Sequence, residues 1–444
     1  MNAPVMESAA RRPRPLADTP STPGPAHARI RSIDALRGFT ILVMIFVNDV
    51  AGVRGTPGWM KHIEPPGADG MTFVDVVFPA FLFIVGLSIP TALERRLARE
   101  STTRVLRHVL TRVLGLLVLG VFMVNSGAAS PAGTLSPHLW SLLVYVAAML
   151  VWVAAPAEAG IDRRVVIAVR VAGAALLAAL ALLFRGPGAP ALVELRHSWW
   201  GILGLIGWAY LVGATAYLIL RDRIPALIGG VVLLYAVFVA DAAGYFAGAT
   251  WLTRWVAVGS MLGSHAALTL SGVVFGAVLL PGSPVATHRA RLRWALAYGA
   301  FLAAAGHLLH AAAAVHPMFI INKIAATPPW CLWSAAITIW AWAGFYWLLD
   351  ARKSPPRASA LEGAGQNTRA SMLESAGQNA LLAYILAPIA YDVFALGAGA
   401  LGVANSYAAL GGTFTTGVAR AAAFAVALTW LAAVLRRRGL VLKL

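Results

Sequence analysis

Residues 71–93 read MTFVDVVFPAFLFIVGLSIPTAL and carry a single charged side chain, Asp75. A run of about 20 apolar residues is enough for a helix to cross the hydrocarbon core of a bilayer. The rest of the 444-residue chain has the same character, since 59% of it is hydrophobic and 12% is charged. Soluble domains are roughly 45–50% apolar and about 25% charged. The chain also has one cysteine, Cys331, which excludes a disulfide scaffold. The sequence therefore predicts an all-α, polytopic integral membrane protein.

Working outward from this stretch, we predict about twelve membrane-spanning helices, near residues 33–53, 71–93, 105–125, 138–156, 163–184, 199–220, 225–246, 263–281, 293–314, 329–349, 377–397 and 415–435. Arginines cluster in alternate loops. The other loops hold few basic residues, namely Arg54, Lys61, Arg185, Arg196, Arg254 and Lys323. Because Lys and Arg accumulate in cytoplasmic loops, this alternation predicts that both termini are cytoplasmic.

The net charge of +17 has the same explanation. Basic residues in short loops between apolar runs are typical of membrane topology, so we expect no nucleic-acid partner. Residues 1–29 are rich in Pro, Ala, Ser and Arg and contain no apolar run. They predict a disordered cytosolic tail, followed by a single membrane domain over residues 30–444.

Polar side chains in and after the first predicted span point to chemistry. Asp34, Arg37 and Asn48 fall on nearly the same helical face, and lipid does not tolerate such a stripe, so it should face the bundle interior. His62 lies in the next loop and Asp75 in the following span. Histidine can accept a proton from a nucleophile near neutral pH. We predict His62 as the base, Asn48 as an amide that orients it or stabilises an oxyanion, and Asp75 as the carboxylate that fixes its tautomer.

Each of these residues also has a structural interpretation. Asn48 can act as an interhelical hydrogen bond, Asp75 as a helix cap, and Asp34 with Arg37 as a local ion pair. His307 and His310 share a helix face, but no Asp, Glu or Cys stands at matching spacing in that helix. We therefore expect hydrogen-bonded histidines there and not a metal site.

Two intramembrane charges near the end of the chain predict a structural contact. Asp392 and Arg420 lie on the last two predicted spans. Because isolated charges are costly in a bilayer, we expect these two side chains to form an ion pair.

The polar motifs are similar to those of the heparan-α-glucosaminide N-acetyltransferase family, whose transmembrane acyltransferases include many bacterial proteins. The matching segments are RSIDALRGF at 31–39, VN at 47–48, KH at 61–62, DGMTFVDVVFP at 69–79, GLSIP at 86–90, WGILGLIG at 200–207, FIINK at 319–323, GQNALLAY at 377–384 and the basic tail at 436–444. The resemblance touches most of the chain after residue 30, and its most specific part lies within the first ninety residues.

The resemblance implies transfer of an acetyl group from cytosolic acetyl-CoA, the cosubstrate, to an amino sugar or envelope glycan on the periplasmic side. It places the family's active-site histidine on His62 and its active-site asparagine on Asn48. It also implies a multi-pass protein of the bacterial inner membrane, and it makes a homodimer plausible. We expect no metal.

Four polar residues are assigned to cofactor binding. Arg37 and Asp34 lie at the predicted cytoplasmic end of the first span, where a guanidinium can meet the phosphates of acetyl-CoA. Asn322 and Lys323 follow the ninth span, and a lysine in an outer loop can meet an anionic group.

Two other functions fit the same sequence. A secondary transporter of a small solute also has many spans with intramembrane polar residues, and it would take up solute without acetyl-CoA. A related acyltransferase that O-acylates an envelope glycan differs in its acceptor, which only donor and acceptor panels can identify.

Overall fold

The computed structural model describes residues 30–127, 135–154, 162–186, 192–221, 223–352 and 370–443. Within these ranges the regular secondary structure is helical, apart from a short antiparallel ribbon formed by β1 (Val153–Ala154) and β2 (Val441–Leu442). This confirms the predicted all-α membrane fold. The tail predicted at 1–29 lies outside the described residues.

Each predicted span overlaps a helix. In the described ranges, ten helical segments are long and apolar enough to cross a membrane. They are formed by α2 (Val74–Leu97), α3 (Thr102–Ser126), α5 (Arg163–Leu183), α6 (Gly201–Leu220), α7 (Ile224–Ala242), the π-helix η3 (Val258–His265) with α9 (Ala266–Val278), α10 (His288–Ala311) with η4 (Ala312–Ala314), α11 (Pro328–Tyr346) with the π-helix η6 (Trp347–Ala351), α13 (Ala380–Leu401) and α15 (Phe414–Arg437).

The two remaining predicted spans correspond to less typical helices. α1 (Arg31–Val50) is 20 residues long but carries four charged side chains: Arg31, Asp34, Arg37 and Asp49. α4 (Pro137–Trp152) is apolar but has only 16 residues. The count of twelve crossings and the cytoplasmic position of both termini therefore stay predictions.

Short elements connect the long helices. They are η1 (Gly58–Met60), α8 (Thr250–Thr253), η5 (Pro317–Phe319), α12 (Met372–Gly377), α14 (Ser406–Ala409) and η7 (Leu410–Gly412). α12 begins with a capping box, in which the Ser371 hydroxyl accepts a hydrogen bond from Glu374 N and the Glu374 carboxylate accepts one from Ser371 N. Such a cap satisfies backbone groups that a six-residue helix leaves without partners.

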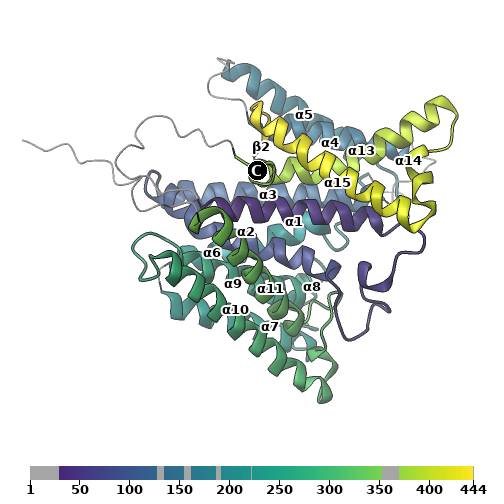
Figure 1. The fold of residues 1–444 in the computed structure, drawn as a ribbon. Helices are drawn as coiled ribbons and strands as arrows, with labels where there is room; N and C mark the ends of the chain where they lie inside the picture. The colour runs from purple at the N-terminus through teal and green to yellow at the C-terminus, as the bar shows by residue number, and fades with distance from the viewer. Residues whose placement is uncertain are drawn as a thin grey trace, which may run out of the picture.

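α1 lies at the centre of the molecule. Figure 1 shows it between α4, α5, α13 and α15 on one side and α9, α10 and α11 on the other. Ile41 and Ile45 of α1 pack into a hydrophobic cluster with α13 and α15. Ile33 and Leu36 join a second cluster built mainly on α2, α9 and α11. α1 therefore connects the two packed bodies of the protein, and a polar side chain on it can face the space between them.

Glycines bring pairs of helices into backbone contact. A Cβ atom on Gly38 of α1 would lie 2.0 Å from a backbone oxygen of α12, and one on Gly377 of α12 would lie 1.9 Å from a backbone oxygen of α1. α2 and α9 approach in the same way at Gly86, where a Cβ would lie 1.9 Å from a backbone oxygen of α9. Only glycine permits these approaches, which hold α12 close against α1 and α9 close against α2.

The end of the chain folds back against the bundle. β2 pairs with β1, and Lys443 N donates to Trp152 O at 2.9 Å. The Asn379 side chain, at the start of α13, donates to Leu440 O at 2.9 Å and accepts from Leu442 N at 3.1 Å. These bonds seat the last described residues beside the first turn of α13.

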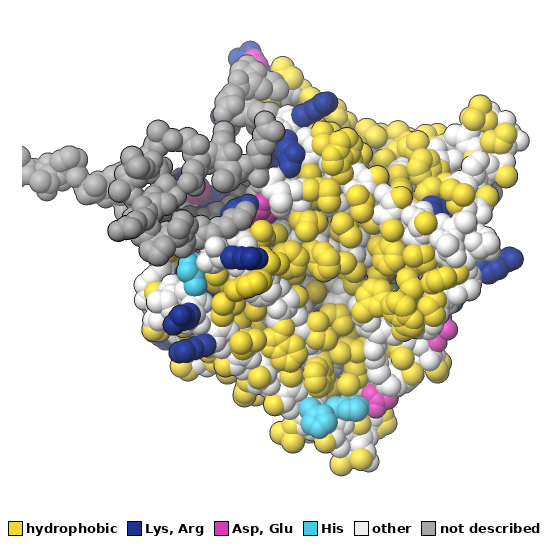
Figure 2. Space-filling model, viewed as in Figure 1, with side chains coloured by type: hydrophobic (Ala, Val, Ile, Leu, Met, Phe, Trp, Pro, Cys, Tyr) yellow, Lys and Arg dark blue, Asp and Glu magenta, His cyan; other side chains and the backbone are white. Residues whose placement is uncertain are grey.

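The surface is consistent with a lipid environment. Figure 2 shows hydrophobic side chains over the middle of the visible face, with Lys and Arg at its margins. The exposed large apolar side chains include Leu114, Val171, Val232 and Leu308. Exposed apolar helix faces of this kind are expected where lipid, and not water, is the solvent.

The predicted ion pair between Asp392 and Arg420 is wrong. Arg420 Nη2 lies 3.2 Å from Asp49 Oδ2 of α1, whereas Asp392 Oδ1 lies 2.9 Å from His138 Nδ1 of α4. The reason is that α15 packs against α1 at this level. Two tyrosine hydroxyls, from α13 and α14, also donate to Asp49.

Candidate active site

The carboxylate of Asp75 organises the loop that joins α1 to α2. Asp75 lies in the first turn of α2 and is fully buried. Its Oδ2 accepts hydrogen bonds from Ile63 N at 3.1 Å and Thr72 N at 3.0 Å. The Thr72 hydroxyl in turn donates to Lys61 O at 2.6 Å. These bonds hold the loop segment around residue 62 against the start of α2.

His62 is the side chain that this arrangement presents. Its Nδ1 lies 2.7 Å from Asp75 Oδ1, and half of the side chain is exposed. Because an ionised carboxylate can only accept a hydrogen bond, Nδ1 carries the proton and Nε2 keeps its lone pair. A carboxylate in this position also stabilises the imidazolium that forms when Nε2 takes up a proton. The pair is therefore suited to general-base chemistry.

Lys323 completes the cluster from a distant part of the sequence. Its Nζ lies 3.1 Å from each ring nitrogen of His62 and 3.9 Å from Asp75 Oδ1. The neighbouring Asn322 is buried, and its amide donates to the carbonyl oxygens of Pro66 and Ala68 at 2.8 and 3.0 Å. Asn322 thus ties the loop before α11 to the loop before α2, and this contact brings Lys323 to His62.

Asn48 lies in the last turn of α1, and its side chain is exposed to a cavity. The cavity has a volume of about 640 Å³ and lies between α1, α2, α3, α6 and α13. Asn48, His62 and Lys323 line one end of it, called here the Asn48 end. An amide, an imidazole and an ammonium group therefore share one space.

The opposite end of the cavity, called here the Arg37 end, is rich in basic side chains. Its lining includes Arg37, Arg96, His108, Arg112 and Lys443. Since α1 rises about 1.5 Å per residue, Arg37 and Asn48 are about 16 Å apart along the helix axis. The same cavity therefore extends from a basic end to the His62 cluster.

Two arginines of this end, Arg37 and Arg112, are held in different ways. Arg37 donates to Asp34 Oδ1 and Gly377 O, each at 3.2 Å, and to the Ser88 hydroxyl. The Arg112 guanidinium carbon lies 4.8 Å from the centre of the Tyr210 ring, a cation–π contact. Arg112 Nε is buried with no hydrogen-bond partner among the described residues. A buried donor of this kind can bind an acceptor that enters the cavity.

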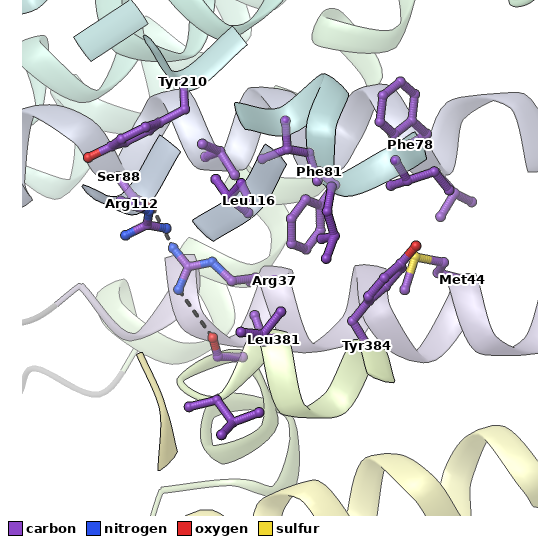
Figure 3. Close-up of a pocket in the computed structure, with 18 of the residues that line it drawn as sticks. Arg37, Met44, Phe78, Phe81, Ser88, Arg112, Leu116, Tyr210, Leu381 and Tyr384 are labelled. Atoms are coloured by element: carbon purple, nitrogen blue, oxygen red, sulfur yellow. Dashed lines mark hydrogen bonds between the residues drawn. The ribbon is translucent and has the colours of Figure 1, made fainter. Parts of the chain in front are cut away.

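Between its two ends the cavity is mainly apolar. Figure 3 shows Arg37, Arg112 and Tyr210 toward the left of the view and Phe78, Met44 and Tyr384 toward the right, with Phe81, Leu116 and Leu381 between them. An apolar passage with polar groups at its ends suits an extended molecule that has an anionic head and an uncharged arm.

The predicted site residues fall into three places. His62 and Asp75 meet as expected, and Asn48 shares their cavity. Arg37 lies at the opposite end of the cavity, while Asp34, 5% exposed, contacts Arg37 and does not line the cavity. Lys323 and Asn322 are far from the basic end. Asn322 joins two loops, and Lys323 belongs with His62.

The residues of the basic end that sequence reasoning missed include Arg112 and Lys443. Arg112 lies inside a predicted span, and an intramembrane arginine is itself a signal of function. No sequence feature marked Lys443 as a site residue, because its place in the cavity wall depends on the ribbon between β1 and β2.

His310 of α10 contacts a carboxylate of the loop before α2. His310 Nε2 lies 2.8 Å from Asp69 Oδ2, and Asp69 Oδ1 accepts from Ile321 N at 2.8 Å. Across the described ranges, no group of three or more His, Cys, Asp or Glu is placed to hold a metal ion. The contact between His310 and Asp69 ties α10 to the loop before α2.

Fold and site together define a polytopic helical membrane protein with a His–Asp pair at one end of a long internal cavity. The sequence profile described as "Domain of unknown function (DUF5009)" matches residues 29–255, about half of the chain, and the chain belongs to this family. It is 34% identical to the human heparan-α-glucosaminide N-acetyltransferase over 113 residues, which cover 25% of this chain and 15% of the human protein. It is 33% identical to the mouse protein over 122 residues, which cover 27% of this chain and 17% of the mouse protein. The match thus spans about a sixth of these relatives.

Proposed function

We propose that this protein is a transmembrane acetyltransferase. It transfers the acetyl group of cytosolic acetyl-CoA to the amine of an amino sugar or envelope glycan on the periplasmic side of the bacterial inner membrane. The observation that carries the proposal is the single cavity that joins a cationic end to the Asn48, His62 and Lys323 end. The names of the two mammalian relatives support acetyl transfer to a glucosaminide amine.

The cationic end suits the nucleotide of acetyl-CoA. Arg37, Arg96, Arg112 and Lys443 line it, and guanidinium groups bind phosphate oxygens in a forked geometry. The Nε atom of Arg112, which has no partner among the described groups, is the donor most in need of such an oxygen. Asp34 contributes indirectly, by fixing the Arg37 guanidinium.

The middle of the cavity suits the pantetheine arm. Met44, Phe78, Phe81 and Leu381 supply apolar walls, against which an uncharged chain can lie without leaving a charge unpaired. The separation of about 16 Å between Arg37 and Asn48 is one that an extended arm has to span for the thioester to reach His62.

At the Asn48 end, His62 Nε2 takes a proton from the acceptor amine as its nitrogen attacks the thioester carbonyl carbon. A C–N bond forms, and the carbonyl oxygen becomes an oxyanion that the Asn48 amide stabilises. The C–S bond then breaks. Asp75 stabilises the imidazolium throughout. If the acetyl group passes first to the imidazole nitrogen, the same groups take part in two steps instead of one.

The test is release of CoA thiol by the purified full-length protein, with glucosamine as acceptor. We expect acceptor-dependent thiol release by the wild type and none by His62→Ala. His138→Ala is the matched control, because His138 also pairs with an aspartate, at 2.9 Å, but does not line the cavity.

Three outcomes contradict the proposal in different ways. Equal turnover by His62→Ala removes His62 from the reaction. Product in which oxygen and not nitrogen is acetylated replaces the proposed acceptor group. Solute uptake into vesicles without acetyl-CoA, combined with no thiol release, identifies a transporter.

A further inference from the structure

Lys323 lies beside His62, the proposed base, at the Asn48 end of the cavity. It lines the same end of the cavity as Asn48 and His62, and its side chain is 22% exposed. The ionisable groups it faces are His62 and Asp75, with Nζ 3.1 Å from both imidazole nitrogens and 3.9 Å from Asp75 Oδ1. It can exchange a proton directly with His62.

The backbone around Lys323 is built to hold this position. Thr327 N donates to Asn322 O at 3.1 Å, and Ala325 N donates to Asn322 Oδ1 at 2.8 Å. Ala326 takes a left-handed conformation with φ of 51°, which is uncommon for a residue with a Cβ atom. The tight turn lies directly after Lys323 and fixes the origin of its side chain.

Resting on the proposed function, we propose that Lys323 is a catalytic general acid that gives its proton to the sulfur of CoA as the C–S bond breaks. His62 and Lys323 then have separate tasks. His62 removes the proton of the attacking amine, and Lys323 supplies the proton of the leaving thiol.

The step balances within the cluster. The amine proton moves to His62 Nε2 while the C–N bond forms. The C–S bond breaks as Lys323 Nζ transfers a proton to sulfur, which leaves CoA thiol and a neutral lysine amine. The His62 imidazolium then returns its proton to Lys323 across the 3.1 Å contact. Both side chains regain their starting states, and no other reactant is needed.

The surroundings explain why sulfur needs a proton donor. A thiolate formed beside apolar walls such as Val74 and Phe78 lacks the hydration that stabilises it in water. Burial lowers the pKa of the Lys323 ammonium, and the charge of Asp75 only partly opposes this effect. Lowering the pKa of a lysine brings it closer to the pKa of a thiol. Such a lysine gives up its proton more readily.

The experiment compares two acetyl donors that differ in how much their sulfur needs a proton. Acetyl-CoA releases an alkyl thiol, whereas S-(4-nitrophenyl) thioacetate releases an aryl thiolate that is stable without a proton. Glucosamine is the acceptor. The variants are Lys323→Met and Lys323→Arg, with Lys61→Met as control, because Lys61 lies in the same loop as His62 but does not line the cavity.

With acetyl-CoA we expect Lys323→Met to lower kcat by about 10²-fold, the usual contribution of a general acid. With the aryl thioester the loss should be much smaller. Lys323→Arg should not restore acetyl-CoA turnover, because arginine keeps the charge but does not release a proton. The loss of kcat at high pH, which reports the acid in wild type, should be absent in Lys323→Met.

Equal losses with both donors, or full recovery in Lys323→Arg, overturn the role of Lys323 as proton donor. Either result leaves the proposed function intact, because both can be observed only if the wild-type protein uses acetyl-CoA. A wild-type protein that is inert toward both donors overturns the proposed function and this inference together. Thermal melting of each variant in detergent identifies one that has lost its fold.

Discussion

At the residue scale, the His62 cluster gathers side chains from three parts of the chain that are remote in sequence. Asp75 fixes the imidazole, Lys323 contacts it, and Asn48 faces the same space from α1. Asn48 is the member without a hydrogen-bond partner among the described residues, and it is exposed to the cavity. An amide in this state is free to bind an oxygen that carries charge only in the transition state.

We therefore predict that Asn48→Ala lowers kcat by about 10²–10³-fold, as the loss of one oxyanion donor does elsewhere, with little change in the KM for acetyl-CoA. The measurement is steady-state thiol release over a range of acetyl-CoA concentrations. Asn405→Ala is the control, because its side chain only caps α14. If Asn48→Ala instead raises KM and leaves kcat unchanged, Asn48 binds ground-state substrate and does not stabilise the oxyanion.

At the element scale, α12 is a helix of six residues that depends on α1 for its position. The Glu374 carboxylate, 2% exposed, accepts from Arg31 Nε at 2.6 Å and from Arg31 Nη2 at 3.1 Å. Burial by itself would raise the pKa of Glu374, but the Arg31 guanidinium and the Ser371 backbone and hydroxyl hold that pKa below its ordinary value. This junction sets the backbone contact at Gly377, next to the Arg37 end of the cavity.

Glu374→Gln should lower the free energy of unfolding by about 1–3 kcal/mol near pH 7, since it weakens charged hydrogen bonds at a buried acceptor. Because the pKa of Glu374 is lowered in the folded state, its stabilisation is complete above the ordinary glutamate pKa and is lost as the pH falls below it. The difference in melting temperature between wild type and variant should therefore shrink on acidification. Glu100→Gln, which removes a more exposed pair with Arg96, should change melting much less. A difference that grows toward acid pH contradicts this account.

Helices were predictable from sequence because most apolar runs are long enough to cross a bilayer on their own. The features that were mispredicted or missed are those that depend on packing between segments far apart in the sequence. The first span was predicted to end near residue 53, but α1 ends at Val50. Neither α12 nor η1 has a periodic pattern of its own. Asp75 beside His62 was a local inference across thirteen residues, whereas the contact of Lys323 with His62 spans 261 residues and depends on the loop that Asn322 holds.

At the scale of the whole molecule, the cavity is a product of how two packed bodies meet along α1. Its wall draws on α1, α2, α3, α6 and α13, and on the end of the chain at Lys443. No single segment of sequence contains that information, which is why Arg112 and Lys443 were missed as site residues. Both ends of the cavity matter for the proposed reaction, because the nucleotide would bind at one end while the thioester reacts at the other.

This continuity leads to a prediction that touches no proposed catalytic group. Leu381 lines the cavity near Arg37 (Figure 3), so Leu381→Trp should fill part of the passage. When acetyl-CoA occupies the passage, the added ring crowds it, and such overpacking costs about 1–3 kcal/mol. The value of kcat/KM for acetyl-CoA should therefore fall at least about fivefold. Melting should change little, because the added ring occupies space that is empty in the free protein.

The matched control lies on the same helix. Val393 is 49% exposed and does not line the cavity, so Val393→Trp should keep kcat/KM while adding the same side chain to α13. The two variants together separate obstruction of the cavity from a general effect of tryptophan on α13. Unchanged kcat/KM in a stably folded Leu381→Trp would mean that the thioester reaches His62 by another path, and the link between the two ends of the cavity would lose its functional meaning.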